Sequence, residues 1–371
     1  MTDTTPQSFG YWQDYLSITK PKVVALMILT AVVGMLLAVE GRPDVVLMLW
    51  ANLGIALVAG GGAAFNHVID ARIDKQMART RLRPIVTGKL SEFQSLLFAI
   101  GITVLGMVIL ALFVNALTAW LTLASLVGYA FIYTGYLKRA TPQNIVVGGL
   151  AGAAPPLLGW TSMTGSIDAY PLILVLMIFI WTPPHFWALA IYRVDDYRKV
   201  GIPMLPVTHG IPYTRLQILL YCFILLAVTL LPVATGHNGL IYLVAVTLLN
   251  FRFIWWAWQL RGSEQRQIAF TTFKFSINYL MWLFVALLID HRFGSPGDTG
   301  DTPAPGAMAD ASVRFYPGAA ALRALFATGL FKDVRIDIEG TVVVVIVEER
   351  PIIASVDFVG LKEFEKDALT K

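Results

Sequence analysis

The chain contains the uncharged stretch VVLMLWANLGIALVAGGGAAF, residues 45–65, which leads directly into NHVIDARID, residues 66–74. A helix rises about 1.5 Å per residue, so the uncharged stretch is long enough to cross the roughly 30 Å hydrocarbon core of a bilayer. The residues that follow include four ionisable side chains, those of His67, Asp70, Arg72 and Asp74. The first stretch predicts a membrane span, and the second places charge at its end.

The rest of the chain repeats this apolar pattern. Hydrophobic residues make up 57% of the 371 positions and charged residues 14%, with a mean hydropathy of +0.67, which excludes that the chain as a whole is a soluble protein. Each apolar run is continuous rather than alternating, which favours helices over barrel strands. The predicted fold class is therefore an all-α polytopic membrane protein with nine transmembrane helices, near residues 22–39, 45–65, 93–114, 117–135, 145–163, 170–190, 216–235, 239–258 and 273–289.

Basic residues indicate how these helices cross the bilayer. The loop after the second span is rich in Lys and Arg, and the loops after the fourth, sixth and eighth spans are also basic. The opposite side holds little beyond Arg42 and Arg292. The positive-inside rule assigns the basic side to the cytoplasm. We therefore expect a cytoplasmic amino terminus and a non-cytoplasmic region after Asp290.

Asn66, Asp70 and Asp74 are spaced four residues apart, which places them on one face of a helix at the end of the second span. Oxygen ligands of this kind suit Mg²⁺, which usually takes a few protein ligands and completes its shell with phosphate and water. Arg79 and Arg83 follow closely and could bind phosphate oxygens. The alternative is a solvated loop in which these acids and bases neutralise one another.

Two further polar stretches lie on the same basic side. The loop after the sixth span carries the adjacent Asp195 and Asp196 beside Arg193, and two facing acidic clusters could clamp a diphosphate through bridging Mg²⁺. Lys138 and Arg139 follow the fourth span and could contact phosphate, or serve only as topology markers.

Two proline pairs interrupt the apolar runs, Pro155-Pro156 in the fifth span and Pro183-Pro184 in the sixth. Proline removes a backbone donor, and a membrane tolerates this where the freed groups face protein or a cavity. The pairs predict broken helices that line a central pocket. The alternative is simple kinking for packing.

Several motifs together resemble a known family. They are NHVIDARID with MARTRLRP (residues 77–84), YLKRATPQNIVVGGLAGAAPPLLGW (136–160) and WTPPHFWALAIYRVDDYRKVGIPMLP (181–206). Over roughly residues 10–292 the chain resembles the membrane-embedded UbiA-type prenyltransferases, and within them the branch that farnesylates haem. The resemblance implies nine transmembrane helices around a central cavity in a bacterial inner membrane. It also implies transfer of a farnesyl group from farnesyl diphosphate to a vinyl group of haem B, with addition of water, which gives haem O.

The same resemblance implies roles for individual residues. It places Asp70, Asp74, Asp195 and Asp196 at the catalytic site, with Asn66 as a further Mg²⁺ ligand. The diphosphate would be bound by Arg79, Arg83, Lys138, Arg139 and Arg193. The second motif departs from the D-x-x-x-D pattern of many relatives, because Ile191 and Tyr192 stand where its first carboxylate would be. Expected partners are farnesyl diphosphate, haem B, the lipid bilayer and a downstream haem A synthase or terminal-oxidase assembly, with no nucleic acid.

Histidine matters because haem iron can take an imidazole ligand. The candidates are His185, which follows Pro184 near the second acidic cluster, and His67 within the first. The alternative for each is a histidine that hydrogen-bonds within the protein.

The end of the chain differs in composition. Residues 1–292 are the predicted transmembrane domain, and residues 293–310, rich in Gly, Pro and Asp, are a predicted flexible linker. Residues 311–371 resemble incomplete polypeptide-transport-associated (POTRA) repeats of the outer-membrane barrel assembly factor, a small α+β appendage. A helix-like segment, ALRALFATG, precedes two predicted strands around Glu339-Gly340.

Two other functions compete with farnesyl transfer to haem. One keeps the diphosphate site but uses another acceptor, such as an aromatic quinone precursor. The other is a membrane transporter or an assembly scaffold that acts through the tail. Substituting Asp70 and deleting the tail would separate the enzymatic hypotheses from the last one.

Overall fold

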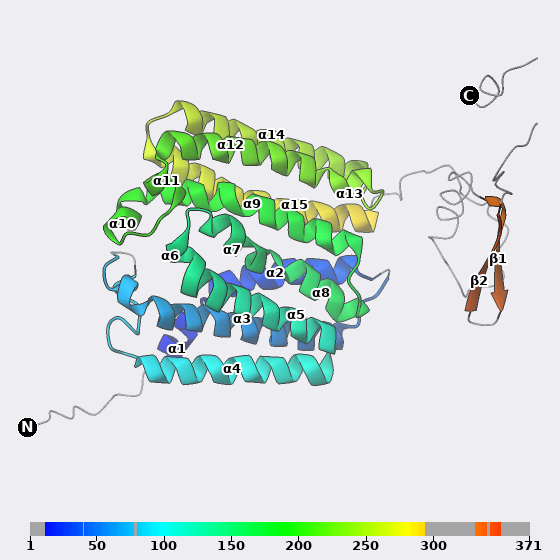
Figure 1. Ribbon diagram of the computed structural model, residues 1–371, viewed down its shortest axis with the longest axis horizontal. Coiled ribbons are helices and arrows are strands. Elements are labelled where there is room, and N and C mark those ends of the chain that lie inside the picture. Colours follow the sequence, from blue (N-terminus) through cyan, green and yellow to red (C-terminus); the bar gives the residue numbers. More distant parts are fainter. Residues whose placement is uncertain (1–11, 40, 78–79, 294–330, 340–341, 350–371) are drawn as a thin grey trace, which may run out of the picture. The chain divides into compact units, whose positions relative to one another are not determined.

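The computed structural model describes residues 12–39, 41–77, 80–293, 331–339 and 342–349 (Figure 1). The chain separates into two units, Met1–Thr299 and Gly300–Lys371, which are described one at a time.

The first unit is a bundle of helices. Among the residues that the structure describes, eight helical segments are long and apolar enough to cross a membrane, and α1 with α2, bent by 54° at their junction, makes a ninth if the pair is taken as one span. The predicted all-α class with nine spans is confirmed. The helices are α1 (Trp12–Ile18), α2 (Pro21–Leu37), α3 (Val45–Asp74), α4 (Glu92–Phe113), α5 (Ala116–Val127), the π-helix η1 (Gly128–Leu137), α6 (Lys138–Ala140), α7 (Asn144–Ala153), α8 (Pro155–Thr164), α9 (Ala169–Tyr192), α10 (Val194–Lys199), α11 (Leu205–Thr208), α12 (Ile211–Thr229), α13 (Leu231–Ala234), α14 (Leu240–Gly262) and α15 (Arg266–Phe293).

The outer surface of this bundle is apolar. On α4, the large side chains of Leu97, Val104 and Leu112 are exposed along most of the helix length. A surface of this kind is unfavourable in water and is the expected lipid-facing surface of a membrane helix. The protein is a multi-pass membrane protein.

The interior of the bundle divides into two hydrophobic cores. One core is built mainly from α3, α4 and α5, with Ile18, Met35 and Leu158 from the helices beside them. The other is built mainly from α9, α12, α14 and α15, with Val33 and Ile145 from α2 and α7. The α2 and α8 helices, which pack closely against each other, contribute residues at the boundary between the two cores.

The start of α3 is fixed by a side-chain cap. The Asp44 carboxylate accepts hydrogen bonds from the backbone N–H groups of Val46 at 2.9 Å and Leu47 at 3.0 Å. Capping satisfies donors that the first turn of a helix leaves free. From this end α3 continues without a break to Asp74. It therefore carries Asn66, Asp70 and Asp74 in its last turns.

The two proline pairs have different outcomes. One helix ends at Ala153 and the next begins at Pro155, so the fifth span is broken at the first pair, as predicted. Pro183 and Pro184 lie inside α9, which is continuous, so the predicted break there is wrong. Both prolines are buried where α9 packs against α7, α12 and α15. This packing holds the helix in one piece although two backbone donors are missing.

In the second unit the described residues form two antiparallel strands, β1 (Phe331–Glu339) and β2 (Val342–Glu349). Val334 pairs with Val347 and Glu339 with Val342, with an irregularity between Phe331 and Asp333. The two predicted strands around Glu339-Gly340 are confirmed. The helix-like segment at 321–329 lies outside the described residues, and the likeness to POTRA repeats stays a prediction.

Candidate active site

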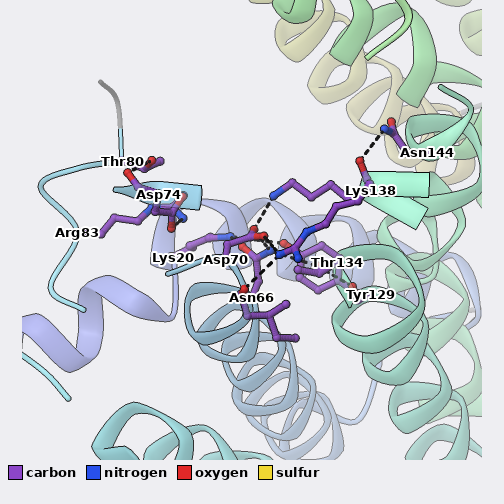
Figure 2. Close-up of polar contacts among 12 residues, drawn as sticks. Lys20, Asn66, Asp70, Asp74, Thr80, Arg83, Tyr129, Thr134, Lys138 and Asn144 are labelled. Carbon is purple, nitrogen blue, oxygen red and sulfur yellow. Dashed lines mark hydrogen bonds and ion pairs between the residues drawn. The ribbon is translucent and has the colours of Figure 1, made fainter. Parts of the chain in front are cut away.

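The first acidic motif forms the predicted ridge on α3. Asn66, Asp70 and Asp74 are all buried, with at most 5% of each residue exposed. Figure 2 shows their side chains among basic and hydroxyl groups that come from other segments. A buried carboxylate is stable only when it is paired with a cation or well hydrogen-bonded. The partners of each acid therefore determine whether its charged form is stable in this site.

Asp70 is the centre of the cluster. Its Oδ2 accepts a hydrogen bond from Asn66 Nδ2 at 2.8 Å and lies 2.5 Å from Lys138 Nζ. Its Oδ1 is buried, accepts no hydrogen bond among the described residues and lies 4.0 Å from Arg139 Nη2. Lys138 begins α6, directly after the π-helix, and Arg139 follows it. The two predicted phosphate-binding residues therefore lie against Asp70.

Asp74 ends α3 and forms an ion pair with Arg83, from the loop that leads to α4. The Thr80 hydroxyl donates to the Asp74 backbone carbonyl at 3.0 Å and helps to turn this loop back onto the helix. The structure thus brings Arg83 to the first motif. Arg79, the other arginine predicted there, lies outside the described residues.

The π-helix η1 forms the wall opposite Asn66. The Asn66 side-chain amide donates to Thr134 Oγ1 at 3.1 Å, and the Thr134 hydroxyl donates to the Tyr129 carbonyl at 2.9 Å. This second bond joins residues five apart, the spacing that a π-helix creates. π-Helical turns are rare and often occur at functional sites. Neither this π-helix nor the role of Thr134 could be recognised from the order of residues.

Lys20 completes the cluster. It lies at the junction between α1 and α2, and its Nζ donates to Asn66 Oδ1 at 2.6 Å and lies 3.4 Å from the Tyr129 hydroxyl. From sequence, Lys20 reads only as a basic residue before the first span. Nothing in the order of residues shows that it contacts a side chain 46 positions later.

The second acidic motif lies on the short helix α10. The Asp195 side chain is 52% exposed and is held by Arg198 at 3.1 Å and Arg266 at 2.5 Å. The Arg266 guanidinium holds the pKa of the Asp195 carboxyl below its ordinary value. The Asp196 side chain is 25% exposed and has Arg193 at 3.6 Å. The contact with Arg266 was not expected from the sequence.

Both motifs lie at the same end of the bundle, where Figure 1 shows α6, α10 and the loop that follows α3. The part of the chain that the structure describes contains no group of three or more His, Cys, Asp or Glu side chains close enough to hold a metal ion. The available donors are the Asn66 amide and single carboxylates. This set fits Mg²⁺, which binds through one or two carboxylates and takes its other ligands from substrate phosphates and water.

The two haem-ligand candidates are both buried. His185 Nδ1 lies 2.6 Å from Ser276 Oγ on α15, and its ring stacks on Trp181 at 4.2 Å and lies 4.6 Å from Phe273. These contacts fix the ring between α9 and α15 and match the alternative of a histidine bonded within the protein. His67 lies on α3 beside Asn66. Haem ligation by either residue stays a prediction.

Comparison with known proteins identifies the family. The model of the UbiA prenyltransferase family matches residues 27–284, most of the helical unit. The chain belongs to the UbiA prenyltransferase family. Two similar UbiA-family relatives are the protoheme IX farnesyltransferases of Marinobacter nauticus, 62% identical over 280 residues, and Hahella chejuensis, 60% identical over 291. These alignments cover 76% and 78% of this chain and 93% and 97% of the relatives.

Solved structures show the same UbiA fold at lower sequence identity. A digeranylgeranylglyceryl phosphate synthase is 18% identical with a TM-score of 0.65, over 76% of this chain and 98% of the other. A UbiA homologue from Archaeoglobus fulgidus, solved with GPP and Mg²⁺, is 14% identical with a TM-score of 0.52, over 74% and 99%.

Proposed function

We propose that this protein transfers a farnesyl group from farnesyl diphosphate to a vinyl group of haem B and so produces haem O. The observation that carries the proposal is the high identity to protoheme IX farnesyltransferases across nearly their whole length. The buried cluster of carboxylates, an amide and cations around Asp70 supports it, because it has the chemistry needed to bind a metal-complexed diphosphate.

In this reaction the bond between C1 of the farnesyl group and the diphosphate oxygen breaks, and both electrons leave with the diphosphate. The vinyl group supplies the electrons of the new carbon–carbon bond, and water adds to the carbon left electron-poor, with release of a proton. Mg²⁺ held by the carboxylates and amide of this site would supply the positive charge that offsets the negative charge developing on the departing diphosphate.

Different residues bind the metal and the diphosphate. Asn66, Asp70 and Asp74 supply oxygen ligands from α3, and Asp196 supplies the metal-binding carboxylate of the second motif. Lys138, Arg139, Arg83, Arg79 and Arg193 bind the diphosphate oxygens as it leaves. Asp195, held by Arg198 and Arg266, joins α10 to the start of α15 instead of binding metal.

The basic loops, the amino terminus and this site lie on the cytoplasmic side of a bacterial inner membrane, with the tail on the periplasmic side. The concentration of Lys and Arg in the loops at the site's end of the bundle supports this orientation. Haem O would then pass to a haem A synthase or to terminal-oxidase assembly.

The test is a pigment assay on membranes that contain the full chain, supplied with farnesyl diphosphate, haem B and Mg²⁺. We expect a more hydrophobic haem on reverse-phase chromatography, with the mass of haem O. Asp70→Asn, which keeps the size of the side chain, should lower the rate by about 100-fold or more, since the metal loses a charged ligand. An unmodified haem together with prenylation of an aromatic acceptor would refute the assignment.

A further inference from the structure

Each polar member of the α3 ridge contacts a cation, and these cations come from three different segments. Lys20, between α1 and α2, donates to Asn66 Oδ1 at 2.6 Å. Lys138, on α6, lies 2.5 Å from Asp70 Oδ2, and Arg83, in the loop before α4, pairs with Asp74 (Figure 2). Three of the oxygens that suit a divalent metal, one on each residue, are therefore occupied by ammonium and guanidinium groups, whereas Asp70 Oδ1 accepts no hydrogen bond among the described residues and has the Arg139 guanidinium 4.0 Å away.

Lys20 is held in place by an unusual backbone conformation. Its φ and ψ are 52° and 59°, and it is the one non-glycine residue in the described part of the chain with a positive φ. A side chain makes this left-handed conformation unfavourable, and such residues concentrate at functional sites. Pro21 follows and begins α2. The bend between α1 and α2 thus directs the Lys20 ammonium to the metal-binding motif.

Because of these contacts, the cations and a metal ion compete for the same oxygens of Asn66, Asp70 and Asp74. The Lys138 ammonium already pairs with Asp70 Oδ2, and it would repel a divalent ion that used the same oxygen, because like charges interact strongly in a buried site. A diphosphate changes the balance, since its oxygens form strong charge-assisted hydrogen bonds with lysine and arginine. The cations can then move to phosphate while the metal takes the protein oxygens, and no buried charge is left unpaired.

We propose that Lys20 is a diphosphate-binding residue, and that Lys20, Lys138 and Arg83 occupy three of the metal-binding oxygens until a diphosphate accepts them. Metal and diphosphate therefore bind together, and neither binds tightly alone. This inference rests on the proposed function, because it takes a prenyl diphosphate as the ligand of the site.

The first experiment measures metal binding without diphosphate. Mn²⁺ is titrated into the purified full chain in lipid nanodiscs, and free Mn²⁺ is followed by electron paramagnetic resonance. We expect weak binding to the wild type and binding about tenfold tighter to Lys138→Gln, in which the competing ammonium is gone. Equal Mn²⁺ affinity in the two proteins would overturn the exchange of cations.

The second experiment measures binding of farnesyl thiodiphosphate, an analogue that resists ionisation, by calorimetry with and without saturating Mg²⁺. We expect Mg²⁺ to strengthen binding to the wild type at least tenfold, and Lys20→Gln to lose about tenfold in the presence of Mg²⁺. Lys20→Arg should restore the affinity. Lys22→Gln is the matched control, since Lys22 lies on the first turn of α2 with an exposed side chain.

The outcomes separate the two proposals. Lys20→Gln behaving like Lys22→Gln would overturn the role of Lys20 and leave the proposed function intact. A wild type that does not bind the analogue even with Mg²⁺ would instead refute the diphosphate site itself. Thermal unfolding of each variant in nanodiscs checks that Lys20→Gln is folded. If Lys20→Gln is unfolded and Lys20→Arg also fails to bind the analogue, Lys20 has a structural role alone.

Discussion

Asp195 and Asp196 are adjacent in the chain but have different surroundings. Both oxygens of Asp195 have arginine partners, Arg198 at 3.1 Å and Arg266 at 2.5 Å, on a side chain that is half exposed. Asp196 is less exposed and has one looser contact, with Arg193 at 3.6 Å. A carboxylate with a closely paired arginine on each of its two oxygens is a poorer metal ligand than one with an oxygen that is not closely paired. Asp196 is therefore the better candidate of the pair.

This difference gives a prediction for two matched variants. Asp196→Asn should lower the rate of haem O formation by about 100-fold, because a metal ligand loses its charge. Asp195→Asn should lower it only a few-fold, through a looser α10. The measurement is the initial rate in membranes as a function of Mg²⁺ concentration, with protein amounts matched by immunoblot. Equal losses in both variants would contradict the division of roles.

The site residues whose spacing lies within one element could be predicted from the sequence. Four-residue steps predicted the Asn66–Asp70–Asp74 ridge, and α3 contains it. The cationic partners were harder to predict. Lys138 and Arg83 were predicted as basic residues near the site, but their pairing with Asp70 and Asp74 depends on how the loops fold back. Lys20 was missed because its contact depends on a left-handed residue at a helix break and on a partner 46 positions away.

At the scale of elements, close approach of helix backbones organises the bundle where α2 crosses α8. A Cβ added at Gly34 would lie 2.1 Å from the Pro156 carbonyl oxygen, and one at Gly159 would lie 2.0 Å from that of Ala31. In lipid there is little hydrophobic gain from bringing helices together, so small residues that permit close contact drive their association. This crossing joins the part of the bundle that carries α3 to the part that carries α9 and α10.

Gly159→Ala should therefore destabilise the protein by about 1–3 kcal/mol, because the added methyl group meets backbone that cannot move aside. We expect a lower midpoint of thermal unfolding in detergent, measured by tryptophan fluorescence. Gly152→Ala on α7 is the control, since a Cβ there meets nothing within 4 Å. A Gly159→Ala protein as stable as the control would show that this crossing can relax.

The apolar spans could be predicted from hydropathy. Hydropathy alone predicts neither the full length of α3 nor the π-helix. Hydropathy ends the second span at residue 65, whereas α3 continues to Asp74, and only the four-residue spacing of the acidic motif indicated this extension. The π-helix at 128–137 has the composition of any membrane span, and its wider turn depends on contacts such as that between Thr134 and Asn66. The helix break predicted at Pro183-Pro184 is absent, because the packing of these buried residues outweighs the loss of their backbone hydrogen bonds.

At the scale of the whole molecule, the two acidic motifs belong to different halves of the helical unit. The first lies on α3, within the core of α3, α4 and α5, and the second follows α9, within the core of α9, α12, α14 and α15. A diphosphate complexed with Mg²⁺ between them would contact both halves at the same end. Substrate binding is therefore expected to stabilise the position of the two halves relative to each other. The packing of α2 on α8 connects these halves.

The tail, residues 300–371, follows the helical unit in the chain. The curated relatives match about three-quarters of this chain yet are themselves covered over 93–97% of their length, so the helical unit corresponds to nearly a whole relative. If farnesyl transfer needs only that unit, deleting residues 300–371 should leave the rate of haem O formation within about twofold of wild type, while Asp70→Asn in the full chain abolishes most of it. The assay is the same pigment separation, with protein amount in the membrane fraction as control. Loss of activity in the truncated but membrane-inserted protein, with Asp70→Asn harmless, would instead favour a scaffold that acts through the tail.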